Sequence, residues 1–261
     1  MRSLSIGSTG MLAQQMNVEV ISNNIANMTT TGFKKQRAEF QDLLYQDIRA
    51  PGSTSSDTGT VVPTGIQLGS GVKSAGVYRI NEQGALLNTQ NSYDLAINGD
   101  GFFEVELPTG DTGYTRNGSF QVTEAGELVT VDGYRLLGPG AIPAEARSVT
   151  INQNGEVLAQ LDGQVAPANL GQITISIFAN DAGLSAQGQN LFLETPASGA
   201  AASAAPGTAG YGVIEQGWLE GSNVNVVNEI TALITAQRAY EMNSRVISTS
   251  DEMMSAVNQL R

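Results

Sequence analysis

The chain lacks two side chains on which much protein chemistry depends, since its 261 residues contain no cysteine and no histidine. Without cysteine there is no disulfide framework, no thiolate nucleophile and no cysteine-ligated zinc or iron–sulfur site. Without histidine there is no imidazole base, no Ser-His-Asp triad and no histidine-ligated metal. We therefore predict that the protein is not an enzyme and that it holds no cofactor, no metal and no catalytic residue.

Charged and aromatic residues are also scarce, at 15% and 6% of the chain, where about 25% charged residues is usual. The 25 acidic and 13 basic side chains give a net charge of -12, which argues against nucleic acid or an anionic membrane as a partner. No apolar run reaches the ~18 residues of a membrane span, so we predict no membrane insertion. The first residues lack the pattern of a cleaved secretory signal.

What the chain does have is a central region of short strands and tight turns, about residues 75–195. Six Asn-Gly or Asp-Gly steps tolerate the positive φ that tight hairpin turns require. They begin at Asn98, Asp100, Asn117, Asp132, Asn154 and Asp162. Between them, residues 102–107, 128–131 and 173–178 have the composition of strands. The pattern predicts a mainly antiparallel β domain.

Two loose stretches, residues 50–71 and 196–212, are rich in Gly, Ser, Thr, Ala and Pro. The second has the composition of a flexible linker. The first also carries apolar side chains, which favour an extended arm that docks on another surface. These side chains are Val61, Val62, Pro63, Ile66 and Leu68.

Both ends of the chain carry apolar residues at seven-residue spacing. The C-terminal column is Val226, Leu233, Tyr240, Ile247 and Met254. The N-terminal column is Leu4, Met11, Val18 and Ile25. The pattern predicts two long helices, with Ser222 or Asn223 as the cap of the second and Gly32 as the stop of the first. Gly7 and Gly10 each cost ~1 kcal/mol in a helix, so we expect the first turns to form only when packed.

Two long half-apolar helices can close one compact domain, or they can pair with each other and with neighbouring copies. We favour the second alternative, with the two columns as an assembly interface that orders on assembly. The predicted fold is α+β, with the terminal helices (residues 1–33 and 222–261) paired as a coiled-coil-like inner-tube bundle. A connecting region with extended and β structure (34–92 and 196–221) contains the arm, and an antiparallel β-rich outer domain spans 93–195.

The strongest remaining catalytic candidate is the carboxylate pair of Glu104 and Glu106 on one predicted strand. Paired carboxylates ~5–9 Å apart are what glycoside hydrolysis uses. The solvated face of a half-buried strand explains the same pattern, and we prefer that interpretation. The basic cluster of Lys34, Lys35 and Arg37 is too short to bind nucleic acid against this net charge.

Four ordered motifs resemble those of the bacterial flagellar axial proteins, the rod and hook family. Residues 22–34 (SNNIANMTTTGFK) and 229–243 resemble the family's terminal signatures, and residues 98–103 and 114–120 resemble its central motifs. The resemblance covers nearly the whole chain. Within the family, the length and residues 57–65 are most similar to subunits of the distal rod.

The resemblance implies a structural subunit that assembles head-to-tail into a rigid hollow helical drive shaft, which carries torque and lets export substrates pass. It implies that the helices form an inner tube and that the arm stiffens the shaft. Implied partners are further copies, proximal rod proteins, the hook protein, the P-ring and L-ring proteins and the flagellar type III export apparatus. The implied location is the basal body across the periplasm, reached without a cleaved signal peptide.

Two alternatives remain at this point. A proximal rod or hook subunit of the same family would differ in its arm and its neighbours. A secreted enzyme or glycan-binding β domain with helical tails would be a monomer with a ligand pocket on residues 93–195.

Overall fold

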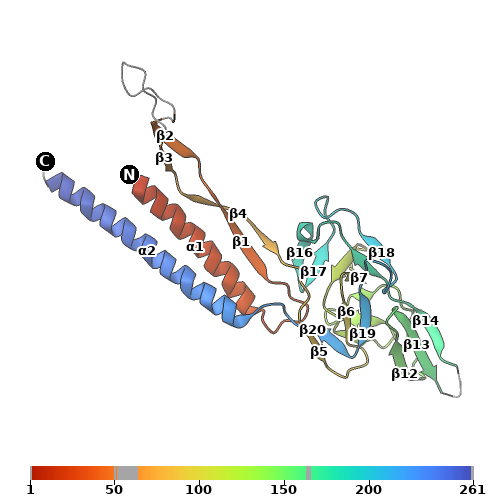
Figure 1. Ribbon diagram of the computed structural model, residues 1–261. Helices are drawn as coiled ribbons and strands as arrows, with labels where there is room; N and C mark the ends of the chain where they lie inside the picture. Colours follow the sequence, from red (N-terminus) through yellow and green to blue (C-terminus); the bar gives the residue numbers. More distant parts are fainter. Residues whose placement is uncertain (1, 50, 52–63, 163–165, 260–261) are drawn as a thin grey trace. The chain divides into compact units, whose positions relative to one another are not determined.

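The structure is a computed structural model that describes residues 2–49, 51, 64–162 and 166–259 (Figure 1). The chain forms two compact units. The first, the helical unit, comprises Met1–Ile25, Gln36–Tyr78 and Asn225–Arg261; the second, the β body, comprises Ala26–Lys35 and Arg79–Val224. An N-terminal helix, a C-terminal helix and a mainly antiparallel β body confirm the α+β class. The division into three domains stays a prediction.

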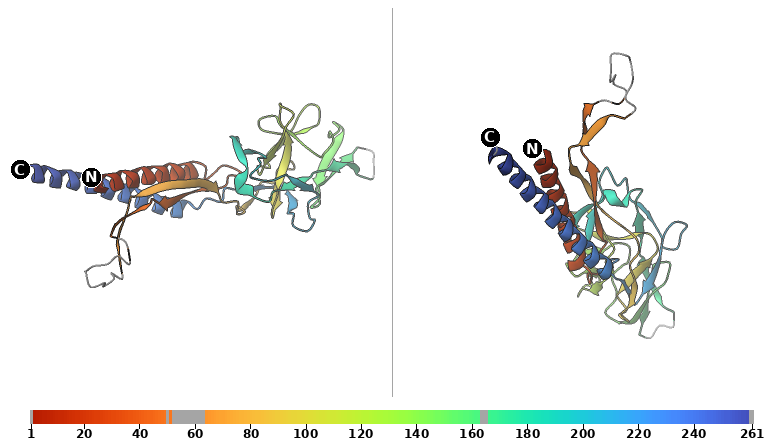
Figure 2. Two further views of the ribbon diagram at one scale, coloured as in Figure 1. Left: turned by 90° about the horizontal axis from the view of Figure 1, so that it is seen from above. Right: turned by 60° about the vertical axis from the view of Figure 1, so that its left-hand side comes forward.

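Two antiparallel helices lie side by side in the helical unit (Figures 1 and 2). Helix α1 spans Arg2–Ala26 and helix α2 spans Val226–Gln259. The cap of α2 is Asn225, whose Oδ1 accepts a hydrogen bond from the Asn228 amide at 3.2 Å. The predicted cap was therefore wrong. Asn223 is used inside the β body instead, where its side chain binds the Lys35 amide and the Ile80 carbonyl.

The first turns of α1 are helical, and their glycines have a packing role. A Cβ on Gly7 would lie 3.0 Å from Cγ1 of Ile247, and one on Gly10 would lie 2.8 Å from Nδ2 of Asn243. The two glycines thus let α2 approach closely, which offsets their low helix propensity.

Gly32 is not the stop of α1, because the helix ends at Ala26. Its φ is +69°, and a Cβ there would meet the backbone of Asn117 at 2.8 Å and of Arg116 at 2.9 Å. The glycine serves a close backbone contact inside the β body.

The helical unit also contains two pairs of strands. β1 (Gln36–Asp42) pairs with β4 (Val72–Arg79), and β2 (Tyr45–Arg49) pairs antiparallel with β3 (Ile66–Gly69). Of the predicted arm residues, Ile66 and Leu68 lie in β3. Val61, Val62 and Pro63 lie outside the described residues. We call the β2–β3 pair the ribbon.

The β body is built from short antiparallel strands. Its largest sheet has the order β16-β17-β8-β7-β11-β10-β9, with β15 pairing both β7 and β18. The smaller sheets are β12-β13-β14, β19-β6 and β20-β5. A single turn of 3-10 helix spans Asp181–Gly183. The strand bounds are β5 Leu86–Asn88, β6 Leu95–Asn98, β7 Phe102–Glu106, β8 Thr112–Thr115, β9 Phe120–Val122, β10 Leu128–Thr130, β11 Arg135–Leu136, β12 Ala146–Ile151, β13 Glu156–Leu161, β14 Ala168–Gln172, β15 Ile175–Ile177, β16 Ser185–Gly188, β17 Leu191–Leu193, β18 Ala202–Ala204, β19 Val213–Gln216 and β20 Trp218–Glu220.

The predicted strands and most of the predicted turns are confirmed. β7, β10 and β15 lie within the three predicted segments. Glycines 99, 101, 133 and 155 have positive φ, as the turns require. Gly118 does not; a Cβ there would lie 1.6 Å from the Leu95 carbonyl oxygen, so close approach demands the glycine. The predicted linker at 196–212 was partly wrong, because it contributes β18 to the sheet.

The core of the β body is formed by side chains that the strands bury completely. Leu95, Phe103 and Ile173 are 0% exposed, and the rings of Phe103 and Phe120 pack edge-to-face at 5.3 Å. A second cluster contains Phe102, Tyr114, Leu184 and Phe192. Because Phe102 and Phe103 belong to different clusters, β7 is buried on both faces.

Candidate assembly surfaces and a buried ionic centre

The contact between α1 and α2 includes small and polar residues. The Ser250 hydroxyl donates to Ser3 Oγ at 3.2 Å, and Nδ2 of Asn24 donates to Oε2 of Glu229 at 3.2 Å. Asn24, which is 2% exposed, also exchanges two hydrogen bonds of 2.8 Å with the backbone of Gln36. Polar residues in such a seam specify register at some cost in stability. The seam fixes how the helices align.

The predicted apolar columns are only partly covered within the helical unit. Leu4, Met11, Val18, Ile25, Val226, Leu233 and Ile247 are half-buried, and Tyr240 and Met254 are 45% and 38% exposed. Ile247 does contact α1, where it covers Gly7. The role of the columns as an assembly interface and in a coiled coil stays a prediction.

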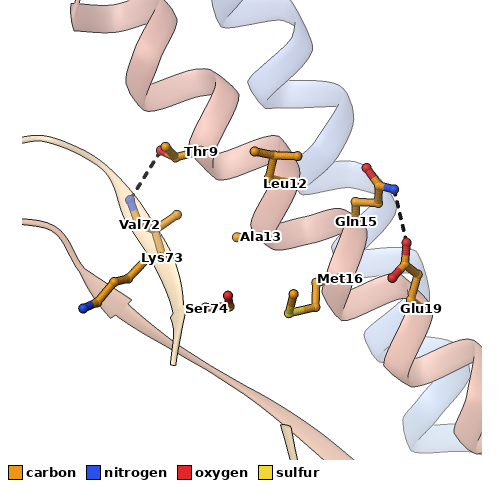
Figure 3. Close-up of a pocket in the computed structure, with 9 residues that line it drawn as sticks. All are labelled: Thr9, Leu12, Ala13, Gln15, Met16, Glu19, Val72, Lys73 and Ser74. Atoms are coloured by element: carbon orange, nitrogen blue, oxygen red, sulfur yellow. Dashed lines mark hydrogen bonds between the residues drawn. The ribbon is translucent and has the colours of Figure 1, made fainter. Parts of the chain in front are cut away.

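A groove of about 450 Å³ runs between α1 and β4 (Figure 3). Leu12, Ala13, Met16 and Val72 give it apolar walls, and Lys73 projects from β4 away from the helix. The carboxylate of Glu19 accepts a hydrogen bond from Gln15 at 3.1 Å. Apart from Glu19 and Lys73, the side chains that line the groove are uncharged.

The ribbon exposes large apolar side chains. Tyr45 and Ile48 are each 58% exposed, and Ile66 and Leu68 are 52% and 45% exposed. Neither β2 nor β3 pairs with a further strand of the described chain. Exposed apolar side chains beside free strand edges are the physical signature of a surface that another protein covers.

Three charged side chains meet in the interior of the β body. Oε1 of Glu220 accepts from Lys34 Nζ at 2.7 Å and from the Gly84 amide at 2.8 Å, and Oε2 accepts from Arg116 Nε at 2.5 Å. Glu220, Lys34 and Arg116 are 1%, 4% and 5% exposed. We call this group the ionic centre.

The cations of the ionic centre also hold backbone carbonyls. Lys34 Nζ donates to the Glu82 carbonyl at 2.8 Å, and the Arg116 guanidinium donates to the carbonyls of Ile97, Gly99 and Gly101. Buried charges are tolerated only when they are paired and hydrogen-bonded in this way.

The electrostatics of the centre favour an ionised carboxylate. Burial opposes ionisation of Glu220, but the charges of Arg116 and Lys34 outweigh it and lower the pKa of this carboxyl group below its usual value. Burial lowers the pKa of Lys34, although the carboxylate of Glu220 opposes that shift. This centre was not predicted from the sequence. The available signal was a single basic side chain in each of two motifs, Lys34 in residues 22–34 and Arg116 in residues 114–120.

The carboxylate pair on β7 does not form a catalytic site. Glu104 accepts hydrogen bonds from the hydroxyls of Thr174, Ser176 and Ser203, so its face is partly covered rather than solvated as predicted. Glu106 is exposed. Among the described residues, no group of three or more acidic side chains could hold a metal ion. Neither helix in the described part of the chain is long and apolar enough to cross a membrane.

Helices with exposed apolar side chains, a ribbon with free edges and a closed β body define a protein that acts by assembly. Three family descriptions match the chain: "Flagella basal body rod protein" at residues 4–34, "Flagellar hook protein FlgE/F/G D1 domain" at 96–159 and "Flagellar basal body rod FlgEFG protein C-terminal" at 215–260.

Full-length relatives give the same result. The chain is 58% identical to the flagellar basal-body rod protein FlgG of Caulobacter vibrioides over 100% of both chains, and 51% identical to that of Agrobacterium fabrum over 99% of both. It is 41% identical to that of Bacillus subtilis, over 100% of this chain and 99% of the relative. The chain belongs to the flagellar basal-body rod protein family.

The family assignment confirms that the chain is a structural subunit of the flagellar basal-body rod, of the distal rod type, and not an enzyme. It removes the support for a secreted enzyme or a glycan-binding domain.

Proposed function

We propose that the chain assembles head-to-tail with further copies into a rigid, hollow helical shaft, which transmits torque from motor to hook and leaves a channel for export substrates. The observation that carries the proposal is the apolar surface that the helical unit leaves uncovered, on both helices and on the ribbon. A heterologous contact that does not close on itself generates such an open helical polymer.

In this proposal the apolar columns of α1 and α2, which are half-buried or exposed in the single chain, pack against neighbouring copies as a coiled-coil-like inner tube. Because helices in water are stabilised mainly by packing, they are less ordered in the dilute monomer than in the polymer. Electron microscopy at stepwise increasing concentration, with helicity followed by circular dichroism, tests this. We expect straight tubes to appear together with a rise in helicity. Full helicity in a monomer at every concentration would contradict folding on assembly.

The ribbon and the segment that joins its strands form the stiffening arm in this proposal. The exposed apolar residues Ile66 and Leu68 support contact with a neighbour, and an additional contact between subunits raises bending stiffness. Deletion of residues 53–69 should give a polymer that bends more easily, measured as a shorter persistence length in electron micrographs. Val131→Asp, at an exposed apolar position of the β body, is the control. It shows whether any change at an exposed apolar position makes the polymer bend more easily. An equally stiff polymer after the deletion would count against the arm.

Further partners follow from a position in the distal rod. They are proximal rod proteins at one end, the hook protein at the other, the P-ring and L-ring proteins as a bushing and the type III export apparatus. An acidic chain without cysteine suits a shaft that crosses the oxidising periplasm and turns inside a sleeve. Delivery without a cleaved signal peptide belongs to the same proposal.

A further inference from the structure

A late segment of the chain, Val213–Asn223, holds together parts of the β body that lie far apart in the sequence. We call it the closing segment. The Glu220 carbonyl accepts from the Gly32 amide at 2.8 Å. The side chain of Asn223 binds the Lys35 amide at 2.7 Å and the Ile80 carbonyl at 2.9 Å. Residues near both ends of the chain are thereby joined.

The closing segment also supplies the strand partner of a core element. β6 is buried at Leu95, Ala96 and Ile97, which are 0–1% exposed, and β19 is the strand that pairs with it in the described chain. β5 likewise pairs with β20. Without β19 and β20, the backbone groups of a core strand would be buried without ladder partners, which is unfavourable.

The buried charges also indicate that the β body needs the closing segment, and this argument does not depend on strand pairing. Lys34 and Arg116 are buried in the β body, and Glu220 of the closing segment is the side chain that forms salt bridges with both. The guanidinium of Arg116 holds the carbonyl of Ile97 in β6 and those of Gly99 and Gly101 in the turn between β6 and β7. Burying these cations before Glu220 arrives would leave two charges uncompensated.

We propose that the closing segment is a completion latch: the β body closes as one cooperative unit only when Val213–Asn223 docks, with Glu220 as the positioning residue. The residues between the two ends of the β body then do not form an independently folded domain. The core containing Phe103 and Phe120 closes at the same time as β19 and β20.

The order of the ionic-centre residues along the sequence determines when the latch can close. Lys34 and Arg116 precede Glu220 in a chain that is made from its N-terminus, and Glu220 lies in the last fifth of the sequence. Most of the chain has therefore emerged before the β body can close. For a subunit delivered unfolded, this order prevents premature closure; that benefit rests on the proposed function, whereas the latch itself does not.

Refolding of the unaltered chain tests the latch directly. Pulse-labelling hydrogen exchange with mass spectrometry follows when the amides of each strand become protected. We expect the amides of β7 and β8 to become protected at the same rate as those of β19 and β20. An intermediate in which β7 and β8 are protected before β19 and β20 would overturn the proposal. This test needs no variant and no assembled rod, so it does not depend on the proposed function.

Glu220→Gln tests the role of the carboxylate, and Glu215→Gln is the matched control. Glu215 lies in the same segment, and its hydrogen bond to Asn98 is at the surface. Native-state hydrogen exchange should show a hundredfold or larger increase in opening for Glu220→Gln, on the order expected for a broken buried ion pair, and it should include the amides of β7 and β8. Glu215→Gln should change opening less than about threefold. Loss of protection confined to the residues around Glu220 would overturn the proposal.

Discussion

The helical unit and the β body differ in how much of their apolar surface they bury. In the β body most strands contribute buried side chains, and Leu95, Phe103 and Ile173 have no exposed surface. In the helical unit, α2 buries Ala236 and Ser250 fully, whereas Val227 and Met242 are 72% and 66% exposed. Since apolar burial is the main stabilising contribution to folding, the β body is stabilised by its own core, whereas the proposed shaft would cover the apolar surface of the helical unit with neighbouring copies. Four experiments test how the two units are packed.

The largest effect is expected from Phe103→Ala in the core of the β body. Removing a fully buried ring that packs on Phe120 leaves a cavity, and the free energy of unfolding should fall by about 3–5 kcal/mol. Urea unfolding followed by near-ultraviolet circular dichroism measures it. Val131→Ala, at a position that is 66% exposed, should change it by less than about 0.5 kcal/mol. A small effect at Phe103 would mean that the core is loosely packed.

The next largest effect should come from a disulfide across the helical unit. Ser3 and Ser250 have their hydroxyl oxygens 3.2 Å apart, and the chain contains no other cysteine to interfere. Ser3→Cys with Ser250→Cys should oxidise within one chain and stabilise the helix pair by about 2–4 kcal/mol. Gel mobility without reductant and helix melting measure both outcomes. Ser3→Cys with Ser248→Cys, on another side of α2, is the control; equal oxidation of both pairs would show that the seam has no fixed register.

A smaller effect separates two glycines of the β body with similar backbone conformations. Gly32 has φ +69° and a crowded backbone contact, whereas Gly133 has φ +88° and nothing within 4 Å of an added Cβ. Gly133→Ala should cost about 1 kcal/mol for the left-handed conformation alone. Gly32→Ala should cost about 2–3 kcal/mol because the backbone of Arg116 and Asn117 must also move. Denaturation midpoints compare them, and equal costs would remove the close contact as the explanation.

The smallest of the four effects is expected from acid. Lowering the pH from neutral should destabilise the β body before the helical unit. The pKa of Glu220 is lowered in the folded protein, so its contribution is fully present above the unfolded pKa of about 4.3 and is lost as the pH falls through the folded value. The fluorescence of Trp218, the single tryptophan, reports on β20. Urea midpoints between pH 7 and 3 should fall for this signal more than for helicity at 222 nm. Parallel falls would argue against a special role of the ionic centre.

The elements that the sequence predicted are those with a local signal. Asn-Gly and Asp-Gly steps specify turns within a few residues, and seven-residue spacing reveals a helix wherever it occurs. Both therefore located α1, α2, β7, β10 and β15, although the bounds differ by a few residues.

The parts that the sequence analysis missed depend on distant partners. The salt bridge of Lys34 with Glu220 joins residues 186 positions apart, and no periodicity marks such a pair. In the helix pair, the prediction rested on the apolar columns and therefore missed the small and polar residues of the seam. Gly7 and Gly10, which were interpreted as unfavourable for α1, were a local sign of the seam, because an added Cβ at either position would crowd α2.

The two ends of the helix pair differ, and this affects how a polymer of this chain would grow. Near Asn24 and Glu229 both helices stop close together, but beyond Ser250 helix α2 continues alone through exposed Asp251–Gln259, a projection of ~13 Å (Figure 2). A column of such pairs placed end to end is polar, because its two ends differ. Its two tips present different surfaces to an incoming copy, so addition at one tip differs in rate from addition at the other.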